Sequence, residues 1–124
     1  PPPINEQNRT MIAALRTELA GRGIDLPIYF GNRNWEPYTG DALRQIHADG
    51  HRRALALITS AYSSYSGCRQ YREDFAVQLD EAGLLGDLQI EKSRSYFNHP
   101  GFLAPIIDGV REALASLARE GARC

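Results

Sequence analysis

The chain has 124 residues, of which 43% are hydrophobic and 23% charged, and its formal net charge is −1. These values are typical of one globular domain with one core, and they give no indication of nucleic acid or an anionic membrane as a partner. No apolar run approaches the roughly 20 residues that span a bilayer, and we expect no secretory signal. The two cysteines, Cys68 and Cys124, do not form a disulfide framework, so a reducing, cytoplasmic setting is expected.

The first part of the chain predicts a helix and a strand. Apolar residues at helical spacing predict an amphipathic helix over residues 6–20, with Asn5 as its N-cap. The short apolar run that follows predicts a strand at about 26–30. Pro27 lies at its start, where a missing backbone N–H is tolerated.

The next segments predict a second helix and a strand that is buried on both faces. The helix begins near Pro37 or Asp41 and ends at Asp49, before a glycine. Residues 53–59 contain the unbroken apolar run ALALIT, which is typical of a central strand in a parallel sheet. The loop SAYSSYSG over residues 60–67, with four serines and two tyrosines, follows that strand.

The last part of the chain predicts a helix, an edge strand and a long helix. The first helix covers about 67–82, with Tyr71, Phe75 and Leu79 in one apolar stripe. The alternation of LQIEK predicts an edge strand at 88–92 with one exposed face. The final helix kinks at Pro105 or begins there, and its apolar stripe predicts a strong core face made by Leu103, Ile106, Ile107, Val110, Leu114 and Leu117.

Helices that alternate with short strands predict an α/β fold with a parallel sheet and right-handed crossovers. By pattern, the strand at 53–59 is central, and those at 26–30 and 88–92 are edges. Ligands of open α/β sheets bind outside the carboxyl ends of the strands. The loops that follow 26–30 and 53–59 are therefore the first candidates for a binding site.

Each of these two loops leaves two interpretations open. Arg33 follows the first strand in the sequence LPIYFGNRNWEP, where its guanidinium can pair with a carboxylate or can be a solvated loop arginine. The loop at 60–67 can bind a ligand through its hydroxyl groups and tyrosine rings, or it can be a flexible turn. Composition alone favours the turn.

Tyr71 and Cys68 lie near the start of the helix at 67–82. By periodicity, Tyr71 is the first residue of the core stripe. Cys68 lies in the first helical turn, where the helix dipole favours a thiolate and so a metal or redox role. A lone cysteine is more often a small buried hydrophobic residue.

The three histidines show no metal-ligand spacing, and each is interpreted as structural. His99, with Pro100 after it, is expected to cap the last helix. Phosphate-binding and nucleophile-elbow motifs do not occur in the sequence. Spacing alone therefore predicts an α/β domain with a ligand loop of unknown purpose.

Four segments, in this order and spacing, resemble the N-terminal half of the ferrochelatase family: PINEQNRTMIAAL, PIYFGNRNWEPY, ITSAYSSYSGCRQY and SYFNHPGF. The first three together are specific, and the resemblance covers nearly all of the chain. The chain is most similar to the bacterial coproporphyrin ferrochelatase branch whose members carry an iron–sulfur cluster. The resemblance implies a chelatase of two similar α/β halves, each a three-layer, Rossmann-like parallel sheet flanked by helices.

The resemblance also implies an activity, which is the insertion of ferrous iron, as substrate, into a porphyrin in heme biosynthesis. The porphyrin is coproporphyrin III or protoporphyrin IX, held in the cleft between the halves. Arg33 and Tyr71 match substrate-binding positions, Arg33 toward a propionate and Tyr71 against the ring. Cys68 matches the cysteine that the N-terminal half gives to a [2Fe-2S] cluster, and no cofactor is expected for this chain alone. No residue of the chain matches the catalytic base.

The chain also departs from the family pattern. Pro2 stands where the family has a serine that contacts the porphyrin. The resemblance implies an opening strand that lies, within the sheet, between the strands at 26–30 and 53–59, and the chain has no segment that matches it. The chain also has no segment that matches the second half of the family fold, which carries the His and Glu that bind iron and move protons. Residues 1–124 are therefore expected to be a partial N-terminal domain that supplies the porphyrin-holding wall. Its expected partners are the porphyrin, the second ferrochelatase domain and, through exposed edges, a second copy of the chain.

Two alternatives to this interpretation stay open. The chain can be a single-domain chelatase that dimerises to build its own cleft, which would need a paired histidine site at a strand end. It can also be a non-catalytic porphyrin-binding or interaction module. Binding of a porphyrin without metal insertion would favour the module.

Overall fold

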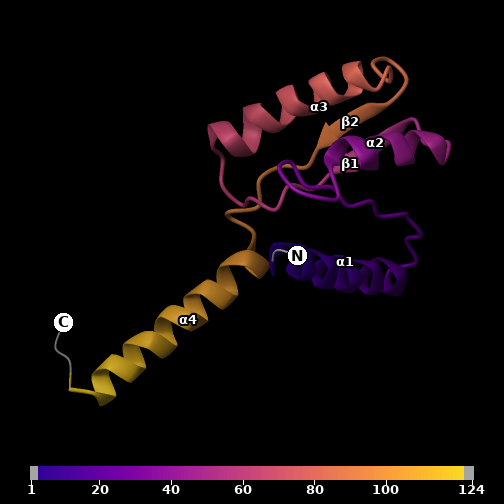
Figure 1. Cartoon of the computed structure of the whole chain (residues 1–124). Coiled ribbons are helices and arrows are strands. Elements are labelled where there is room, and N and C mark those ends of the chain that lie inside the picture. The colour runs from indigo at the N-terminus through magenta and orange to yellow at the C-terminus, as the bar shows by residue number, and fades with distance from the viewer. Residues whose placement is uncertain (1–2, 122–124) are drawn as a thin grey trace. The chain divides into compact units, whose positions relative to one another are not determined.

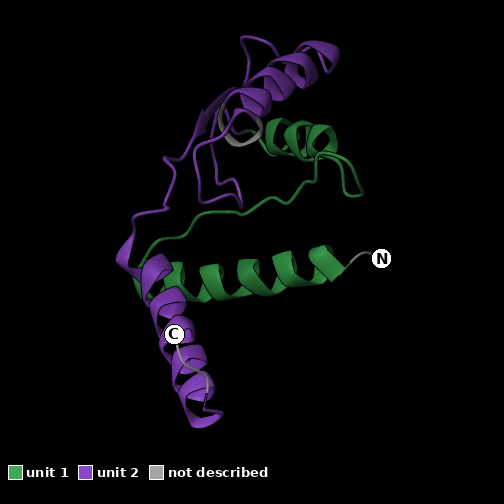
Figure 2. Cartoon of the chain, turned by 90° about the vertical axis from the view of Figure 1, so that its left-hand side faces the viewer, with its two compact units in different colours: residues 1–50 green, residues 51–124 purple. Residues whose placement is uncertain are grey.

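The computed structural model describes residues 3–121, apart from the side chains of residues 66–68. The chain divides into two compact units, residues 1–50 and residues 51–124 (Figure 2). Pro2 and Cys124, which were named in the sequence analysis, lie outside the described residues, as does the side chain of Cys68.

Unit 1 contains two helices, α1 at Pro3–Gly21 and α2 at Thr39–Ala48 (Figure 1). Both predicted helices of this part of the chain are confirmed. The predicted N-cap at Asn5 is wrong, because α1 already begins at Pro3, and proline is tolerated at the first helical position. Asn5 lies inside the first turn of α1 and is only 4% exposed.

The predicted strand at 26–30 is also wrong. Residues 24–31 belong to no helix or strand, and the next backbone pairing is an isolated parallel bridge between Asn32 and Tyr38. An extended segment becomes a strand only where a neighbouring strand satisfies its N–H and C=O groups. Within the described residues, this segment has no such neighbour.

Side chains hold the extended segment to the helices of unit 1 instead. The Arg16 guanidinium donates a hydrogen bond to the Ile28 carbonyl at 3.2 Å. The Tyr29 hydroxyl donates to the Asp49 carboxylate at 2.7 Å, and Gln45 donates to the other oxygen of that carboxylate, also at 2.7 Å. The hydrogen bond from Tyr29 to Asp49 raises the pKa of Tyr29 above its ordinary value, and desolvation and the negative charge of Asp49 add smaller contributions in the same direction. The shift favours the protonated phenol, which is the form that donates this hydrogen bond.

Unit 2 contains a parallel pair of strands and the helices that follow them (Figure 1). Its strands pair with Ala54 opposite Ile90, which confirms the α/β class and the parallel pairing. The elements are β1 at Arg53–Ala56, the π-helical segment η1 at Tyr65–Gln70, α3 at Tyr71–Glu81, β2 at Gln89–Lys92 and α4 at Pro100–Arg119.

The prediction that the strand at 53–59 is buried on both faces is wrong. β1 alternates between exposed and half-buried positions, and Leu55 is 71% exposed. Leu57, which follows the strand, is 50% exposed. In the described residues the sheet has two strands, so each strand is an edge and β1 has no second neighbour. β2 alternates in the same way, which confirms the predicted edge strand.

The helix expected at 67–82 begins earlier and in a different geometry. Residues Tyr65–Gln70 form the π-helical η1, which continues directly into α3. The predicted stripe is confirmed, because Leu79 is buried and the half-buried rings of Tyr71 and Phe75 lie 6.3 Å apart between centroids. π-Helical turns inside helices are rare and are often found at functional sites.

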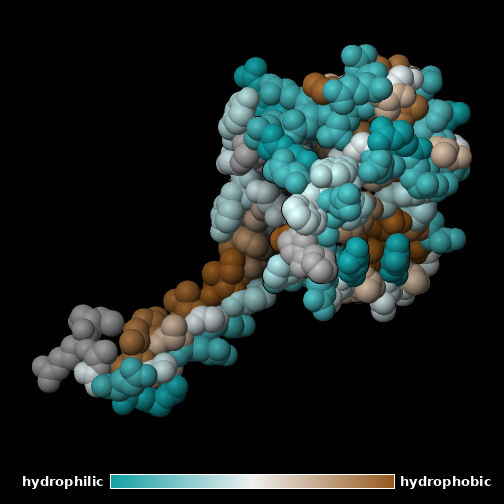
Figure 3. Space-filling view, in the orientation of Figure 1, coloured by the Kyte–Doolittle hydropathy of each residue, from teal (hydrophilic) through white to brown (hydrophobic). Residues whose placement is uncertain are grey.

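α4 begins at Pro100 and contains Pro105, which excludes the alternative that the helix begins at Pro105. The predicted cap at His99 is confirmed, because its imidazole Nδ1 accepts a hydrogen bond from the Gly101 N–H at 3.0 Å. The predicted core face of α4 is exposed, as the brown stripe in Figure 3 shows. Exposed fractions along the stripe are 37% for Leu103, 45% for Ile106, 46% for Ile107, 55% for Val110, 51% for Leu114 and 45% for Leu117.

The apolar residues that are buried in unit 2 lie on and around the two strands and α3. They are Ile58, Ala61, Leu79, Leu84 and Leu88. Ile58 and Ala61 follow the carboxyl end of β1, whereas Leu84 and Leu88 precede β2. Among the helices that the structure describes, none is both long and apolar enough to cross a membrane.

Candidate ligand-binding site

The turn over residues 31–39, which follows the extended segment of unit 1, is closed by backbone hydrogen bonds. The Asn32 N–H donates to the Pro37 carbonyl at 2.6 Å, and the Thr39 N–H donates back to the Asn32 carbonyl at 2.9 Å. The Thr39 hydroxyl donates to the same carbonyl at 3.0 Å. Asn32 is thus bonded through both its N–H and its C=O, which fixes both ends of the turn.

Gly31 allows this close approach of the two ends. A Cβ atom at this position would lie 2.7 Å from the Thr39 Cα and 3.0 Å from the Thr39 nitrogen. Both atoms belong to the backbone, so a rotamer change cannot relieve the clash. The glycine of the GNRN sequence is therefore a requirement of the turn.

A buried amide network also joins the turn to the start of α1. The Asn5 Nδ2 donates to the Glu36 carbonyl at 2.7 Å, and the Asn32 Nδ2 donates to the Asn5 Oδ1 at 2.7 Å. A longer bond of 3.3 Å runs from the Asn32 Nδ2 to the same Glu36 carbonyl. Sequence reasoning missed this role, because an asparagine just before a helical pattern has the usual signature of a cap.

The turn carries one cation, Arg33, and two exposed aromatic residues, Trp35 and Tyr38. Arg33 is half-buried within it, while Trp35 is 54% exposed and Tyr38 is 46% exposed. A guanidinium pairs with carboxylates in a planar fork, and exposed aromatic rings offer flat apolar surfaces. Such a set can bind a flat aromatic molecule that bears carboxylates. Arg33 was predicted to follow a strand, and the structure places it in this hydrogen-bonded turn instead.

In unit 2, the loops that follow β1 and β2 lie against each other. The Phe97 N–H donates to the Ala61 carbonyl at 3.1 Å. The ring of Phe102 packs edge-to-face against Tyr62 at 6.0 Å and against Tyr96 at 5.5 Å between centroids. The serine-rich loop at 60–67 is therefore joined to the SYFNHP segment by aromatic packing at the carboxyl end of both strands.

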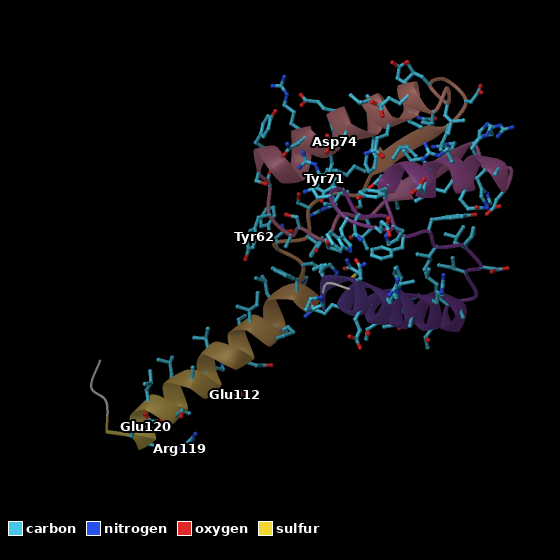
Figure 4. The ribbon with its side chains drawn as sticks, viewed as in Figure 1. Tyr62, Tyr71, Asp74, Glu112, Arg119 and Glu120 are labelled. Atoms are coloured by element: carbon cyan, nitrogen blue, oxygen red, sulfur yellow. The ribbon has the colours of Figure 1, made fainter. Side chains whose placement is uncertain are left out.

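Tyr71 is the first residue of α3, one turn before Asp74 (Figure 4). The helix start is tied by the Arg69 guanidinium, which donates to the Glu73 carboxylate at 2.8 Å. Cys68 lies in η1, but its side chain is outside the described part of the chain. No group of three His, Cys, Asp or Glu side chains that could hold a metal ion occurs in the described residues.

The predicted site residues belong to different units, and each has neighbours within its own. Arg33 shares its turn with Trp35 and Tyr38 in unit 1. Tyr71 pairs with the Phe75 ring in unit 2, and Cys68 lies in the helical segment just before it. The chain thus offers two candidate ligand surfaces, one in each unit.

Comparison with known proteins places the whole chain in one family. Residues 2–123 match the family model described as Ferrochelatase. The chain is 58% identical over 115 residues to the coproporphyrin III ferrochelatase of Leifsonia xyli, a match that covers 93% of the chain and 30% of the relative. It is 57% identical over 120 residues to the protein of the same name from Streptomyces griseus, covering 95% of the chain and 32% of the relative.

A relative whose name does not specify coproporphyrin III matches the chain to a similar extent. The chain is 54% identical over 121 residues to the ferrochelatase of Rhodopirellula baltica, which covers 98% of the chain and 34% of the relative. The chain therefore spans about a third of the length of these curated relatives. The match of the family model to nearly every residue, together with these identities, shows that the chain belongs to the ferrochelatase family.

Proposed function

We propose that this chain is the N-terminal part of a ferrochelatase, a lyase that inserts ferrous iron into a porphyrin in heme biosynthesis. Two of the three relatives described above are named for coproporphyrin III, which supports that porphyrin as the substrate. In this proposal the chain supplies the porphyrin-holding wall, and the second ferrochelatase domain completes the cleft. The cytoplasmic location inferred from the cysteine content is part of the proposal, and fractionation of cells that make the protein tests it.

The observation that carries this proposal is the turn at 31–39. A porphyrin is a flat aromatic ring with carboxylates at its edge. The guanidinium of Arg33 suits a propionate because it can form two parallel charge-assisted hydrogen bonds. The exposed rings of Trp35 and Tyr38 suit the apolar macrocycle. The closed backbone of the turn holds these groups in place before the ligand arrives, which reduces the entropy lost on binding.

Tyr71 is the second proposed contact, on the surface of unit 2. Its ring is half-buried and already packed against Phe75, so it can face the macrocycle with little loss of rotamer freedom. The role of the chain in the reaction is to bind and orient the porphyrin. Iron insertion must also remove two pyrrole protons, which needs a base close to the ring. We assign no residue of this chain to that base.

Replacement of Arg33 tests the proposal. Titration of the chain with coproporphyrin III, followed by visible absorbance, is expected to give about 10- to 150-fold weaker binding for Arg33→Gln, because a hydrogen bond to a charged group contributes roughly 1.5–3 kcal/mol. Arg9→Gln, which removes an exposed arginine from α1 of the same unit, is the matched control and is expected to bind like the unchanged chain. Equal affinities for all three proteins would contradict the proposal.

Cys68 is proposed to give one thiolate to an iron–sulfur cluster of the complete enzyme. Such clusters usually have four protein ligands, and the chain has two cysteines in all, so the chain alone does not fit a cluster. Anaerobic reconstitution with ferrous iron and sulfide is expected to leave no stable visible chromophore after desalting. One cluster per monomeric chain, measured by iron analysis and sedimentation, is the result that would refute this.

A further inference from the structure

We propose that Asn5 is a positioning residue of the porphyrin site, whose buried amide sets the shape of the turn at 31–39 and so places the guanidinium of Arg33. The inference rests on the proposed function, because it assumes that Arg33 meets a propionate. It adds to that function a residue on α1, outside the turn itself.

Burial is the first observation. Asn5 is 4% exposed and lies in the first turn of a helix whose other residues are exposed or half-buried. A buried amide is destabilising unless its donor and its acceptor are both satisfied. At Asn5 both are satisfied, and both partners belong to the turn. The buried side chain of Asn5 therefore joins α1 to the turn at 31–39.

The positions of the two partners are the second observation. Asn5 donates to the carbonyl of Glu36 and accepts from the side chain of Asn32, and Arg33 lies between these two residues in the chain. The amide therefore bridges the two ends of the segment that carries the guanidinium. Without it, the Glu36 carbonyl would keep only the 3.3 Å bond from the Asn32 side chain.

The orientation of the amide is fixed by chemistry. The Glu36 carbonyl can only accept, so the Asn5 NH₂ must face it, and the Asn5 oxygen must face the Asn32 NH₂. An aspartate at this position keeps the size of the side chain but sets a negative oxygen against the Glu36 carbonyl. Asn5→Asp therefore breaks one end of the bridge and retains the other.

The experiment compares two porphyrins, coproporphyrin III and its tetramethyl ester. The ester has the same ring but no carboxylate for Arg33. Asn5→Asp and Asn5→Ala are expected to bind the free acid about tenfold more weakly, in line with a charge-assisted bond lost when Arg33 is misplaced. Their affinity for the ester is expected to stay the same. Asn8→Ala, which removes a half-buried asparagine one turn along α1, is the matched control and is expected to change neither affinity.

Amide hydrogen exchange gives a second readout of the turn itself. The N–H groups of Asn32 and Thr39 close the turn, so both are expected to exchange faster in the Asn5 variants, while the amides in the last turn of α2 keep their rates. If both Asn5 variants fail to fold, Asn32→Ala takes their place, since it removes the donor to the Asn5 oxygen from the other side without adding a charge beside Arg33. The same loss of affinity for the free acid alone is then expected.

Two results would overturn the inference. One is unchanged affinity for the free acid in a folded Asn5 or Asn32 variant. The other is an equal loss for the acid and the ester, which is what a purely structural role produces. The proposed function fails separately, because it requires Arg33→Gln to weaken binding of the acid. An effect of Arg33→Gln without an effect of Asn5→Asp defeats the inference alone.

Discussion

The 124-residue chain by itself is expected to insert no ferrous iron into coproporphyrin III above the spontaneous rate. Removal of the pyrrole protons needs a general base beside the ring, and loss of such a group typically lowers a rate by about 10²- to 10⁴-fold. Of the histidines, His99 already accepts a hydrogen bond as the cap of α4. In the proposed function, the second ferrochelatase domain supplies the groups that bind iron and move protons.

The measurement is an anaerobic incubation of chain, porphyrin and ferrous iron, with the visible absorbance bands followed over time. The full-length coproporphyrin III ferrochelatase of Streptomyces griseus, at the same concentration, is the positive control for the assay. Multiple turnovers by the chain at a rate above the protein-free reaction would contradict the expectation. They would favour instead the alternative in which two copies of the chain build a complete cleft.

Self-association through α4 is the second large effect that we expect. Its stripe leaves Leu103, Ile107, Val110 and Leu114 between 37% and 55% exposed. Full burial of such a side chain contributes roughly 1.5–3 kcal/mol, so a patch of this size favours contact with another apolar surface. In a solution that contains only the 124-residue chain, a second copy of the chain is the available partner. We therefore expect a dimer at micromolar concentration.

Sedimentation equilibrium measures this directly. Leu114→Glu places a charge on the stripe and is expected to shift the chain toward the monomer, because an unpaired charge is costly to bury. Ala115→Glu adds the same charge to an exposed position next in the sequence but off the stripe, and it is expected to leave the dimer intact. A monomer for the unchanged chain, with a cooperative melt, would show that the exposed stripe needs no partner.

Local patterns predicted the helices and the parallel strand pair, and they failed where a long-range partner decides the structure. The spacing of apolar residues placed α1, α2 and α3, because helical hydrogen bonds are made within the segment itself. The segment at 26–30 has the composition of a strand, but it has no neighbouring strand in the described chain to pair with. The apolar run ALALIT predicts a strand that is buried on both faces, but β1 pairs with one neighbouring strand and its Leu55 is exposed.

The candidate site shows the same division. The position of Arg33 in a polar loop follows from the sequence, since Gly31 and the asparagines interrupt the apolar run before it. The closure of that loop does not, because the partners of Asn5 are Asn32 and the Glu36 carbonyl, far along the chain. Contacts across such a separation leave no periodic signal. A buried polar residue in a helix becomes informative only once its partners are known.

The central claim, that the turn at 31–39 forms the porphyrin-holding wall, is tested most directly by the indole N–H signal of Trp35 in a proton–nitrogen NMR spectrum. Trp35 is the only tryptophan of the chain, so its signal needs no further assignment. The ring current of a porphyrin shifts nearby protons strongly and fades steeply with distance. Added coproporphyrin III is predicted to shift this signal in a saturable way, with the affinity found by absorbance, and Arg33→Gln is predicted to weaken the response. Binding seen by absorbance while the Trp35 signal stays in place would contradict the claim.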